Sequence, residues 1–163
     1  ICGIVDFAHN RLSFEKLFDA AFQEYVSYRR IISVFGCPGG KAFNRRRELG
    51  VIAGMFSDQV IVTTDDPGME SQAAIADQIR GYVEMTGCSC TCIEDRNEAV
   101  RKAISMAAKS RQRTLVLLLG RGSEKFQQIG GKSLACETDA QMIKEAISEY
   151  DREKSRSRSE KVS

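Results

Sequence analysis

Apolar residues follow two different periods along this chain, and the two periods alternate. Short runs rich in Val, Ile and Leu predict strands at residues 3–8, 30–36, 59–64, 88–93 and 114–120. Between and after them, apolar residues recur every three or four positions and predict helices at about 14–26, 46–56, 74–83, 99–107 and 140–150. This alternation is typical of an α/β fold, a doubly wound three-layer sandwich with a mostly parallel, Rossmann-like sheet.

Polar residues and one long apolar run refine this prediction. Residues 114–120 read TLVLLLG, an uninterrupted apolar run that is typical of a strand at the centre of a parallel sheet. Ser13 precedes the first apolar helix positions and is a candidate N-cap, while Asp95 and Glu98 have the spacing of a capping box.

Composition sets the expected limits of the domain and excludes some partners. The chain has 163 residues and a net charge of +2, which argues against a nucleic-acid partner. No apolar run approaches the roughly 20 residues of a membrane span, and no secretory signal opens the chain. We expect one domain at 1–150 and a disordered polar tail at 151–163, DREKSRSRSEKVS, for which a solvated terminus is favoured over RNA binding. The missing initiator Met predicts a piece of a longer chain.

Six cysteines raise the question of disulfides or a metal site. Cys88, Cys90 and Cys92 alternate along one predicted strand, so their side chains share a face and could bind a metal ion. However, the chain has no C-x-x-C pair, and its single histidine, His9, is far away in the sequence. We therefore favour the interpretation in which they are small apolar side chains with free thiols, as in a reducing cytoplasm.

Four polar or glycine-rich segments follow predicted strands, at residues 6–10, 36–47, 65–68 and 120–124. In an open α/β sheet, ligands bind beyond the carboxyl ends of the strands, and these ends share one edge. We therefore expect the four segments to form one site. Their mixture of arginines and acids predicts a zwitterionic ligand.

The segment GCPGGKA at 36–42 resembles a phosphate-binding loop but fails the test for one. Phe35 stands where the pattern requires Gly, and Ala42 stands where it requires the Ser or Thr that binds Mg²⁺. A tight turn explains the glycines equally well. The arginines at 45–47 are either solvated or available to bind a carboxylate bidentately.

The remaining segments supply acids and one histidine. The DDPG sequence at 65–68 has the composition of a turn, and it would also place carboxylates near a cationic group. In GRGSE at 120–124, glycine permits a close approach of the backbone, and Glu124 adds another acid. His9 could be a base, a ligand or a capped loop residue, and its chemistry alone favours the structural role.

Taken in order, these motifs resemble the third domain of the Mur ligases, especially that of the UDP-N-acetylmuramoyl-tripeptide synthetases. VDFAHN at 5–10 resembles the family's V-D-Y-A-H-T, and VFGCPGG at 34–40 resembles V-F-G-C-G-G-D. Arg45 and Arg46 fall at the family's K-R, VIVTTDDP at 60–67 resembles V-V-T-D-D-N-P, and GRGSE resembles G-K-G-H-E. The match runs in order from residue 3 to about residue 150.

The resemblance implies an ATP-dependent ligase of peptidoglycan precursor synthesis, located in the bacterial cytoplasm. In this family, ATP phosphorylates the carboxylate of a UDP-muramoyl peptide, and the amine of an amino acid then attacks the acyl phosphate. Magnesium ions offset the phosphate charge. The N-terminal and central ATPase domains are absent from this chain. The central domain would hold most of the ATP and Mg²⁺, so the isolated domain is expected to be inactive.

The resemblance also implies roles for single residues. Arg46 resembles the arginine that holds the α-carboxylate of the amino acid, and Asp66 stands at the Asn or Asp of the family's acidic turn. Gly120 and Glu124 match residues that contact the far end of the substrate, and Asp6 matches the aspartate that meets the nucleotide ribose. No residue of the chain is assigned to a metal.

Departures from the family pattern bear on the substrate. Members that use meso-diaminopimelate carry Arg after the Pro of the acidic turn, where this chain has Gly68. Loss of that cation leaves an acidic pocket, which predicts L-lysine or a similar diamino acid such as ornithine. Arg121 and Ser123 replace the family's Lys and His, while His9 matches the motif histidine and is the one candidate catalytic residue.

Three alternatives stay open at this point. The DFAHN sequence at 6–10 also resembles folylpolyglutamate synthases and cyanophycin synthetases, from which the acidic turn and the G-x-G-x-E sequence distinguish it. The chain could instead be a non-catalytic module that binds an amino acid. A nucleotide-binding Rossmann protein is disfavoured because no G-x-G-x-x-G follows the first strand.

Overall fold

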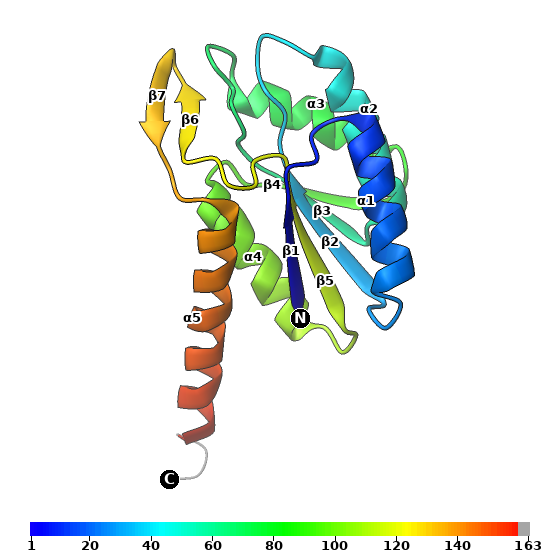
Figure 1. The fold of residues 1–163 in the computed structure, drawn as a ribbon, viewed down its shortest axis with the longest axis vertical. Coiled ribbons are helices and arrows are strands. Elements are labelled where there is room, and N and C mark those ends of the chain that lie inside the picture. Colours follow the sequence, from blue (N-terminus) through cyan, green and yellow to red (C-terminus); the bar gives the residue numbers. More distant parts are fainter. Residues whose placement is uncertain (160–163) are drawn as a thin grey trace.

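Five parallel strands form the central sheet of the computed structural model, which describes residues 1–159 (Figure 1). Every neighbouring pair is parallel, and β5 lies between β1 and β2. Each residue of β5 is buried, so the central position predicted from its apolar run is confirmed. In spatial order the strands are β1 (Cys2–Asp6), β5 (Thr114–Leu119), β2 (Arg30–Phe35), β3 (Gln59–Val62) and β4 (Ser89–Cys92).

Helices cover both faces of this sheet (Figure 1). One face carries α1 (Arg11–Glu24), α2 (Phe43–Phe56) and α3 (Gln72–Glu84), and the other carries α4 (Arg96–Lys109) and α5 (Asp139–Ser159). Alternate residues of each inner strand point to opposite layers: Phe35 packs with α1 to α3, and Val34 packs with α4 and α5. The predicted doubly wound three-layer sandwich is therefore confirmed.

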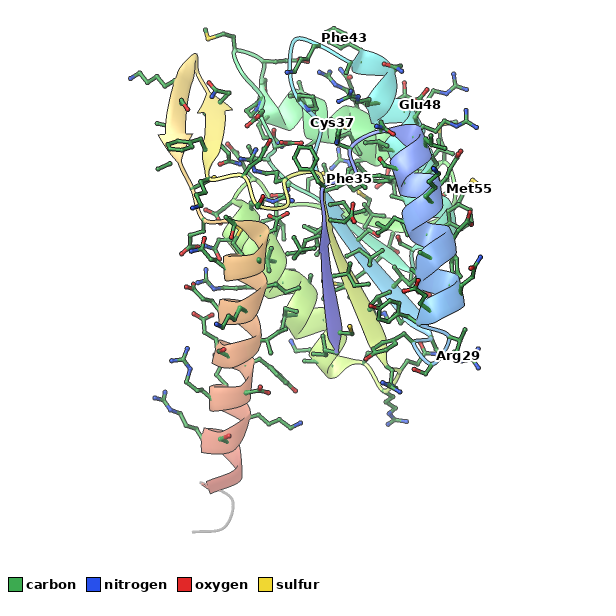
Figure 2. All side chains as sticks on the ribbon, viewed as in Figure 1. Arg29, Phe35, Cys37, Phe43, Glu48 and Met55 are labelled. Atoms are coloured by element: carbon green, nitrogen blue, oxygen red, sulfur yellow. The ribbon has the colours of Figure 1, made fainter. Side chains whose placement is uncertain are left out.

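The side chains at the carboxyl end of β2 show how the core reaches the sheet edge. Phe35 and Cys37 are buried between the layers, whereas Phe43 is exposed at the outer rim (Figure 2). Phe35 packs edge to face on Phe14 of α1, with 5.4 Å between the ring centroids. The loop that follows β2 therefore starts from a rigid, apolar base.

The cysteines behave as small apolar side chains. Cys88, Cys90 and Cys92 are partly buried against the core on the α1 to α3 side of the sheet. All six cysteines are free thiols. Their packing against the core agrees with the interpretation as small apolar side chains.

The N-cap of α1 lies three residues earlier than predicted. Asn10 is the N-cap: its side chain accepts a hydrogen bond from the Ser13 amide at 3.0 Å, and the Ser13 hydroxyl accepts one from the Asn10 amide at 3.1 Å. Ser13 thus closes a capping box from the third helical position, and its prediction as N-cap was wrong. Asp95 does cap α4, as predicted, by accepting from the Glu98 amide at 2.7 Å.

The predicted disordered tail is wrong for residues 151–159, because α5 continues to Ser159 (Figure 1). Bonds along the helix support this extension: Arg152 donates to the Ser148 carbonyl, and the Ser155 hydroxyl donates to the Asp151 carbonyl. Charged residues with long side chains favour a helix even where no apolar face is buried. Residues 160–163 lie outside the described residues. No helix within 1–159 is long and apolar enough to cross a bilayer.

An antiparallel hairpin of β6 (Phe126–Ile129) and β7 (Lys132–Ala135) was not predicted. Both strands are mostly exposed, so they lack the apolar run by which the other strands were found. The turn between them consists of Gly130 and Gly131, whose φ angles of 58° and 73° are those that a tight hairpin turn requires. This Gly-Gly pair was the available signal.

Candidate functional site

The four segments expected to form one site do meet at the carboxyl edge of the sheet (Figure 1). The Gly120 amide donates to the Asp6 carbonyl at 3.2 Å, which joins the loops after β5 and β1. The Gly39 amide donates to the Asp66 carbonyl at 2.9 Å, which joins the loops after β2 and β3. The predicted convergence is therefore confirmed.

Two glycines allow these loops to approach each other closely. A Cβ atom on Gly39 would lie only 1.9 Å from the Pro67 carbonyl oxygen, so no larger residue fits there. Gly120 has a φ angle of 102°, which is unfavourable for any residue with a side chain. The glycines of segment 36–42 thus serve a packed turn, in agreement with the failed test for a phosphate-binding loop.

An ionic cluster lies where the loops after β3 and β5 meet, and we call Asp65, Asp66, Arg121 and Glu124 the rim cluster. One terminal nitrogen of Arg121, Nη1, lies 3.1 Å from Asp65 Oδ1, 2.8 Å from Asp66 Oδ1 and 3.4 Å from Glu124 Oε2. Arg121 is only 1% exposed. Asp66, Gly120 and Glu124 were predicted site residues and lie together, whereas the central role of Arg121 was missed.

Burial and charge act in opposite directions on the rim cluster. Burial raises the pKa of Asp65 above its ordinary value, against the lowering effect of Arg96 and Arg121. Burial also raises the pKa of Glu124, and Arg121 opposes it. For Arg121, burial alone would lower the pKa, but Asp65 and Asp66 outweigh it and raise the pKa. The guanidinium is therefore the fixed charge of the rim cluster.

The rim cluster has the spacing of a metal site but not its charge balance. Among residues 1–159, only Asp65, Asp66 and Glu124 form a group of three ligand-type side chains whose oxygens lie within 4.8 Å of one another. Arg121 already binds all three carboxylates. A divalent ion would have to compete with this guanidinium at the same oxygens.

The β6–β7 hairpin forms a wall beside the rim cluster. Arg121 Nη2 donates to the Phe126 carbonyl, and the Gln128 amide donates to Asp66 Oδ1 at 3.0 Å. The Gly68 amide donates to the Gln128 carbonyl at 2.9 Å. The acidic turn is thereby held between the hairpin and the loop after β2.

Arg46, predicted to hold a ligand carboxylate, is bound inside the protein. Its Nη1 and Nη2 donate to Glu70 Oε1 and Oε2 at 2.8 and 2.7 Å, and Nη1 also donates to Gln78 at 2.9 Å. The Arg46 guanidinium stacks over the Phe43 ring, 4.7 Å from its centroid. It is connected to the rim cluster through the loop backbone, since its Nη2 reaches the Pro38 carbonyl, next to Gly39.

The loop after β1 contributes Asp6 and His9. Asp6 Oδ1 accepts from the Ala8 amide at 2.7 Å, which fixes the carboxylate at the sheet edge. His9 Nδ1 lies 2.7 Å from the Phe7 carbonyl oxygen, which can only accept, so Nδ1 is the donor in this contact. The charge of His9 is among those that lower the pKa of Glu124, which places its ring near the rim cluster.

A buried ion pair beneath the site was not predicted. Arg96 Nε and Nη2 each lie 2.7 Å from an oxygen of Asp139, and Nη2 also donates to the Leu119 carbonyl at 3.0 Å. Its Nη1 reaches the Thr64 carbonyl at 3.4 Å. Arg96 therefore ties together the ends of β3 and β5, where the rim cluster begins. Nothing in the spacing of a single Arg after an N-cap Asp signals this role.

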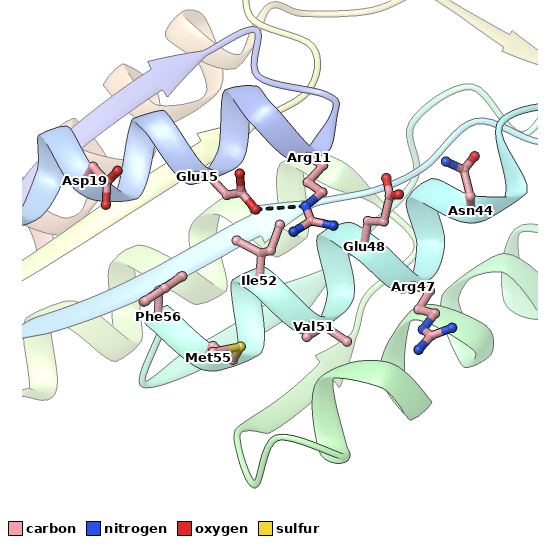
Figure 3. Close-up of a pocket in the computed structure, with 10 residues that line it drawn as sticks. All are labelled: Arg11, Glu15, Asp19, Asn44, Arg47, Glu48, Val51, Ile52, Met55 and Phe56. Atoms are coloured by element: carbon pink, nitrogen blue, oxygen red, sulfur yellow. Dashed lines mark hydrogen bonds and ion pairs between the residues drawn. The ribbon is translucent and has the colours of Figure 1, made fainter.

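Two grooves border this region. The first, of about 620 Å³, lies at the sheet edge between the acidic turn, the hairpin and the start of α4; its lining includes Gly68, Glu70 and Gln127. The second, of about 780 Å³, runs between α1 and α2, with Ile52 and Phe56 in its wall and charged residues around them (Figure 3). Both volumes fall in the range of small-molecule sites. Only the first adjoins the acidic turn.

Comparison with known proteins gives this geometry a family context. Residues 1–122 match the family described as Mur ligase, glutamate ligase domain. The chain is 34% identical over 144 residues to the UDP-N-acetylmuramoyl-L-alanyl-D-glutamate--L-lysine ligase of Streptococcus suis (strain 05ZYH33), covering 88% of this chain and 28% of that protein. It is 33% identical over 148 residues to the corresponding 2,6-diaminopimelate ligase of Caldanaerobacter subterraneus subsp. tengcongensis, covering 91% and 30%.

Solved structures agree on the fold. A UDP-N-acetylmuramoyl-L-alanyl-D-glutamate--2,6-diaminopimelate ligase matches with a TM-score of 0.79 at 23% identity, over 91% of this chain and 29% of that one. The folylpolyglutamate synthase of Mycobacterium tuberculosis matches with a TM-score of 0.57 at 21% identity, over 72% and 26%. The chain thus spans less than a third of each relative's length.

Proposed function

The chain belongs to the Mur ligase family, and from this premise we propose that it is the amino-acid-binding C-terminal domain of an ATP-dependent ligase. The full-length enzyme would join a diamino acid of the L-lysine type to UDP-N-acetylmuramoyl-L-alanyl-D-glutamate, in the cytoplasm of a bacterium. Residues 1–150 would form this domain, and the isolated chain would bind the amino acid without catalysing ligation. Its partners would be the peptide substrate, the amino acid and the other domains of the full-length protein.

The observation that carries the proposal is the pairing of two opposite charges at one sheet edge. Asp66 and Glu124 carry carboxylates, and Arg46, whose guanidinium fork Glu70 occupies, is connected to them through the loop at Pro38 and Gly39. An amino acid with a second amine has the complementary charges: a carboxylate at one end and an ammonium at the other.

The charge of the rim cluster supports a side chain that ends in ammonium. Three carboxylates face one guanidinium there, so the cluster keeps a negative charge. Gly68 stands where a cation would be needed for the second carboxylate of diaminopimelate. The relatives include ligases for both amino acids, so the preference for L-lysine rests on these local charges.

In the reaction that we propose, this domain binds and orients the nucleophile. Binding the far ammonium at Asp66 and Glu124 would leave the α-amine directed at the activated carboxyl of the peptide, which is where proximity accelerates amide formation. His9 Nε2 could accept a proton from that amine. Asp6 would contact the ribose of ATP, whereas the triphosphate and Mg²⁺ would be held by the central domain. Within residues 1–159, Arg121 already binds the acidic group that has the spacing of a metal site.

A ligase assay tests the proposal. The full-length gene product is incubated with UDP-N-acetylmuramoyl-L-alanyl-D-glutamate, ATP, Mg²⁺ and either L-lysine or meso-diaminopimelate, and phosphate release and product mass are measured. We expect amide formation with L-lysine. Preference for diaminopimelate would refute the substrate assignment, and activity only with tetrahydrofolate and glutamate would refute the reaction.

A further inference from the structure

Glu70 occupies the guanidinium fork of Arg46 in the way that a ligand carboxylate would. Its two oxygens face Nη1 and Nη2 at 2.8 and 2.7 Å, a bidentate geometry. The Gly40 amide donates a third hydrogen bond to Glu70 Oε2, at 2.9 Å. Arg46 and Gly40 together therefore form a complete carboxylate seat, and the chain fills this seat with its own side chain.

No other part of the Arg46 guanidinium is open to a ligand. Arg46 is 1% exposed, and its Nε is buried without a hydrogen-bond partner. Phe43 covers one face of the guanidinium, and Gln78 and the Pro38 carbonyl take the remaining terminal hydrogens. A ligand carboxylate can reach Arg46 bidentately only by taking the place of Glu70.

The surroundings of Glu70 allow it to leave. Its side chain is 26% exposed and forms part of the wall of the 620 Å³ groove at the sheet edge. The Glu70 amide donates to the Pro67 carbonyl at 3.0 Å, so the backbone of this turn stays in place. The side chain of Glu70 can leave by rotating into the groove, while Arg46 stays fixed by its buried partners.

We propose that Glu70 is a built-in competitor for the α-carboxylate of the amino acid, and that it thereby sets the affinity and the selectivity of this seat. The inference rests on the proposed function. The carboxylate of the ligand has to replace that of Glu70, so a diamine without a carboxylate gains no affinity from Arg46. Since binding requires a free seat, the apparent affinity is reduced by the fraction of molecules in which Glu70 fills it.

Protonation does not release this competitor near neutral pH. The hydrogen bonds from Arg46, and then from Gly40, lower the pKa of Glu70 to about 2. Glu70 therefore stays charged in the seat until a ligand carboxylate displaces it.

The test is calorimetric titration of L-lysine into the full-length gene product, as wild type, as Glu70→Gln and as Glu98→Gln. Glu98 lines the same groove without contacting Arg46, so this variant controls for the loss of one acid. We expect Glu70→Gln to bind L-lysine about tenfold more tightly, because a neutral amide holds Arg46 less strongly than a carboxylate. Glu98→Gln should bind L-lysine with the affinity of the wild type. Cadaverine, which has no carboxylate, should bind the wild type and Glu70→Gln with equal affinity.

Weaker or unchanged L-lysine binding by Glu70→Gln would overturn the inference. Such a result is expected if Glu70 only positions Arg46 and does not compete with the ligand. A wild-type protein that binds no L-lysine would overturn the proposed function as well, so the two failures are distinguishable. If Glu70→Gln does not fold, a crystal structure of the wild type with L-lysine decides the question. Glu70 displaced from Arg46 supports the inference, and Glu70 still bidentate overturns it.

Discussion

Replacing Arg121 by Met should destabilise the domain strongly, because it removes the cation that directly binds the buried carboxylate of Asp65. The variant keeps a long apolar side chain in the same place, so the main loss is electrostatic. Asp65 is the acid most affected, since its side chain is only 12% exposed. Asp66 and Glu124, at 29% and 41%, regain water more easily.

The expected loss of unfolding free energy is about 3 kcal/mol, the lower end of the range for removing one partner of a buried ion pair. The contact with Glu124 adds little, because half-exposed pairs are screened by solvent. For a chain of this size, each kcal/mol shifts Tm by roughly 2–4 °C. We therefore expect Tm to fall by roughly 6–12 °C.

Circular dichroism melts of the 163-residue chain at pH 7 measure this change. Arg101→Met is the matched control: it removes an exposed ion pair with Glu149 and should leave Tm unchanged. Adding Asp65→Asn to Arg121→Met should recover part of the loss. A Tm for Arg121→Met within about 2 °C of wild type would refute the account of the rim cluster.

Lowering the pH should reduce the loss of stability caused by Arg121→Met. Burial raises the pKa of Asp65 above its ordinary 3.8, so the protonated form is favoured by folding, and stability from this group is lost as pH rises. Without Arg121 the pKa of Asp65 rises further. The Tm difference between Arg121→Met and wild type should therefore shrink as the pH is lowered from 7 towards 4.

Three more predictions follow from single contacts. Arg96→Met should lower the free energy of unfolding by about 3–5 kcal/mol, measured by urea denaturation. The double variant Arg96→Met/Asp139→Leu should be close to wild type in stability. Equal losses in the single and the double variant would contradict the buried ion pair. Gly39→Ala should destabilise the domain by about 1–3 kcal/mol, because the added Cβ overpacks the loop. Gly81→Ala, on the exposed side of α3, should stabilise the domain by about 0.5–1 kcal/mol. Thermal melts of both variants measure these changes. Wild type should be more stable than Glu70→Gln above pH 4.5, and this advantage should vanish as the pH falls to about 2, because folding lowers the pKa of Glu70. A difference in Tm between the two proteins that stays constant from pH 7 to pH 2 would disprove this.

The parallel sheet was predictable from sequence because its inner strands, β2, β3 and β5, are buried on both faces. Residues 114–119 are apolar at almost every position, and the structure places them between two other strands. The hairpin at 126–135 was missed because its strands are mostly exposed and carry no such run. The extension of α5 to Ser159 was missed because a solvated charged helix and a disordered segment have similar compositions.

The site was predictable only as far as sheet topology dictates it. Asp66, Gly120 and Glu124 follow buried strands, so their convergence could be inferred from the order of strands and helices. The acidic side chains that pair with Arg46 and Arg96 inside the protein could not be inferred in this way. Glu70 lies 24 positions after Arg46, and Asp139 lies 43 positions after Arg96, with no periodic pattern that links them. Such pairs depend on the packing of loops, which no local signal encodes.

Titration of L-lysine and L-norleucine into the full-length gene product tests the central claim most directly, because the two differ only in the terminal amine. If Asp66 and Glu124 bind an ammonium group, L-lysine should bind at least about tenfold more tightly, the order of one charge-assisted contact. The double variant Asp66→Asn/Glu124→Gln should abolish that difference. Equal affinity for the two ligands in the wild type would contradict the claim.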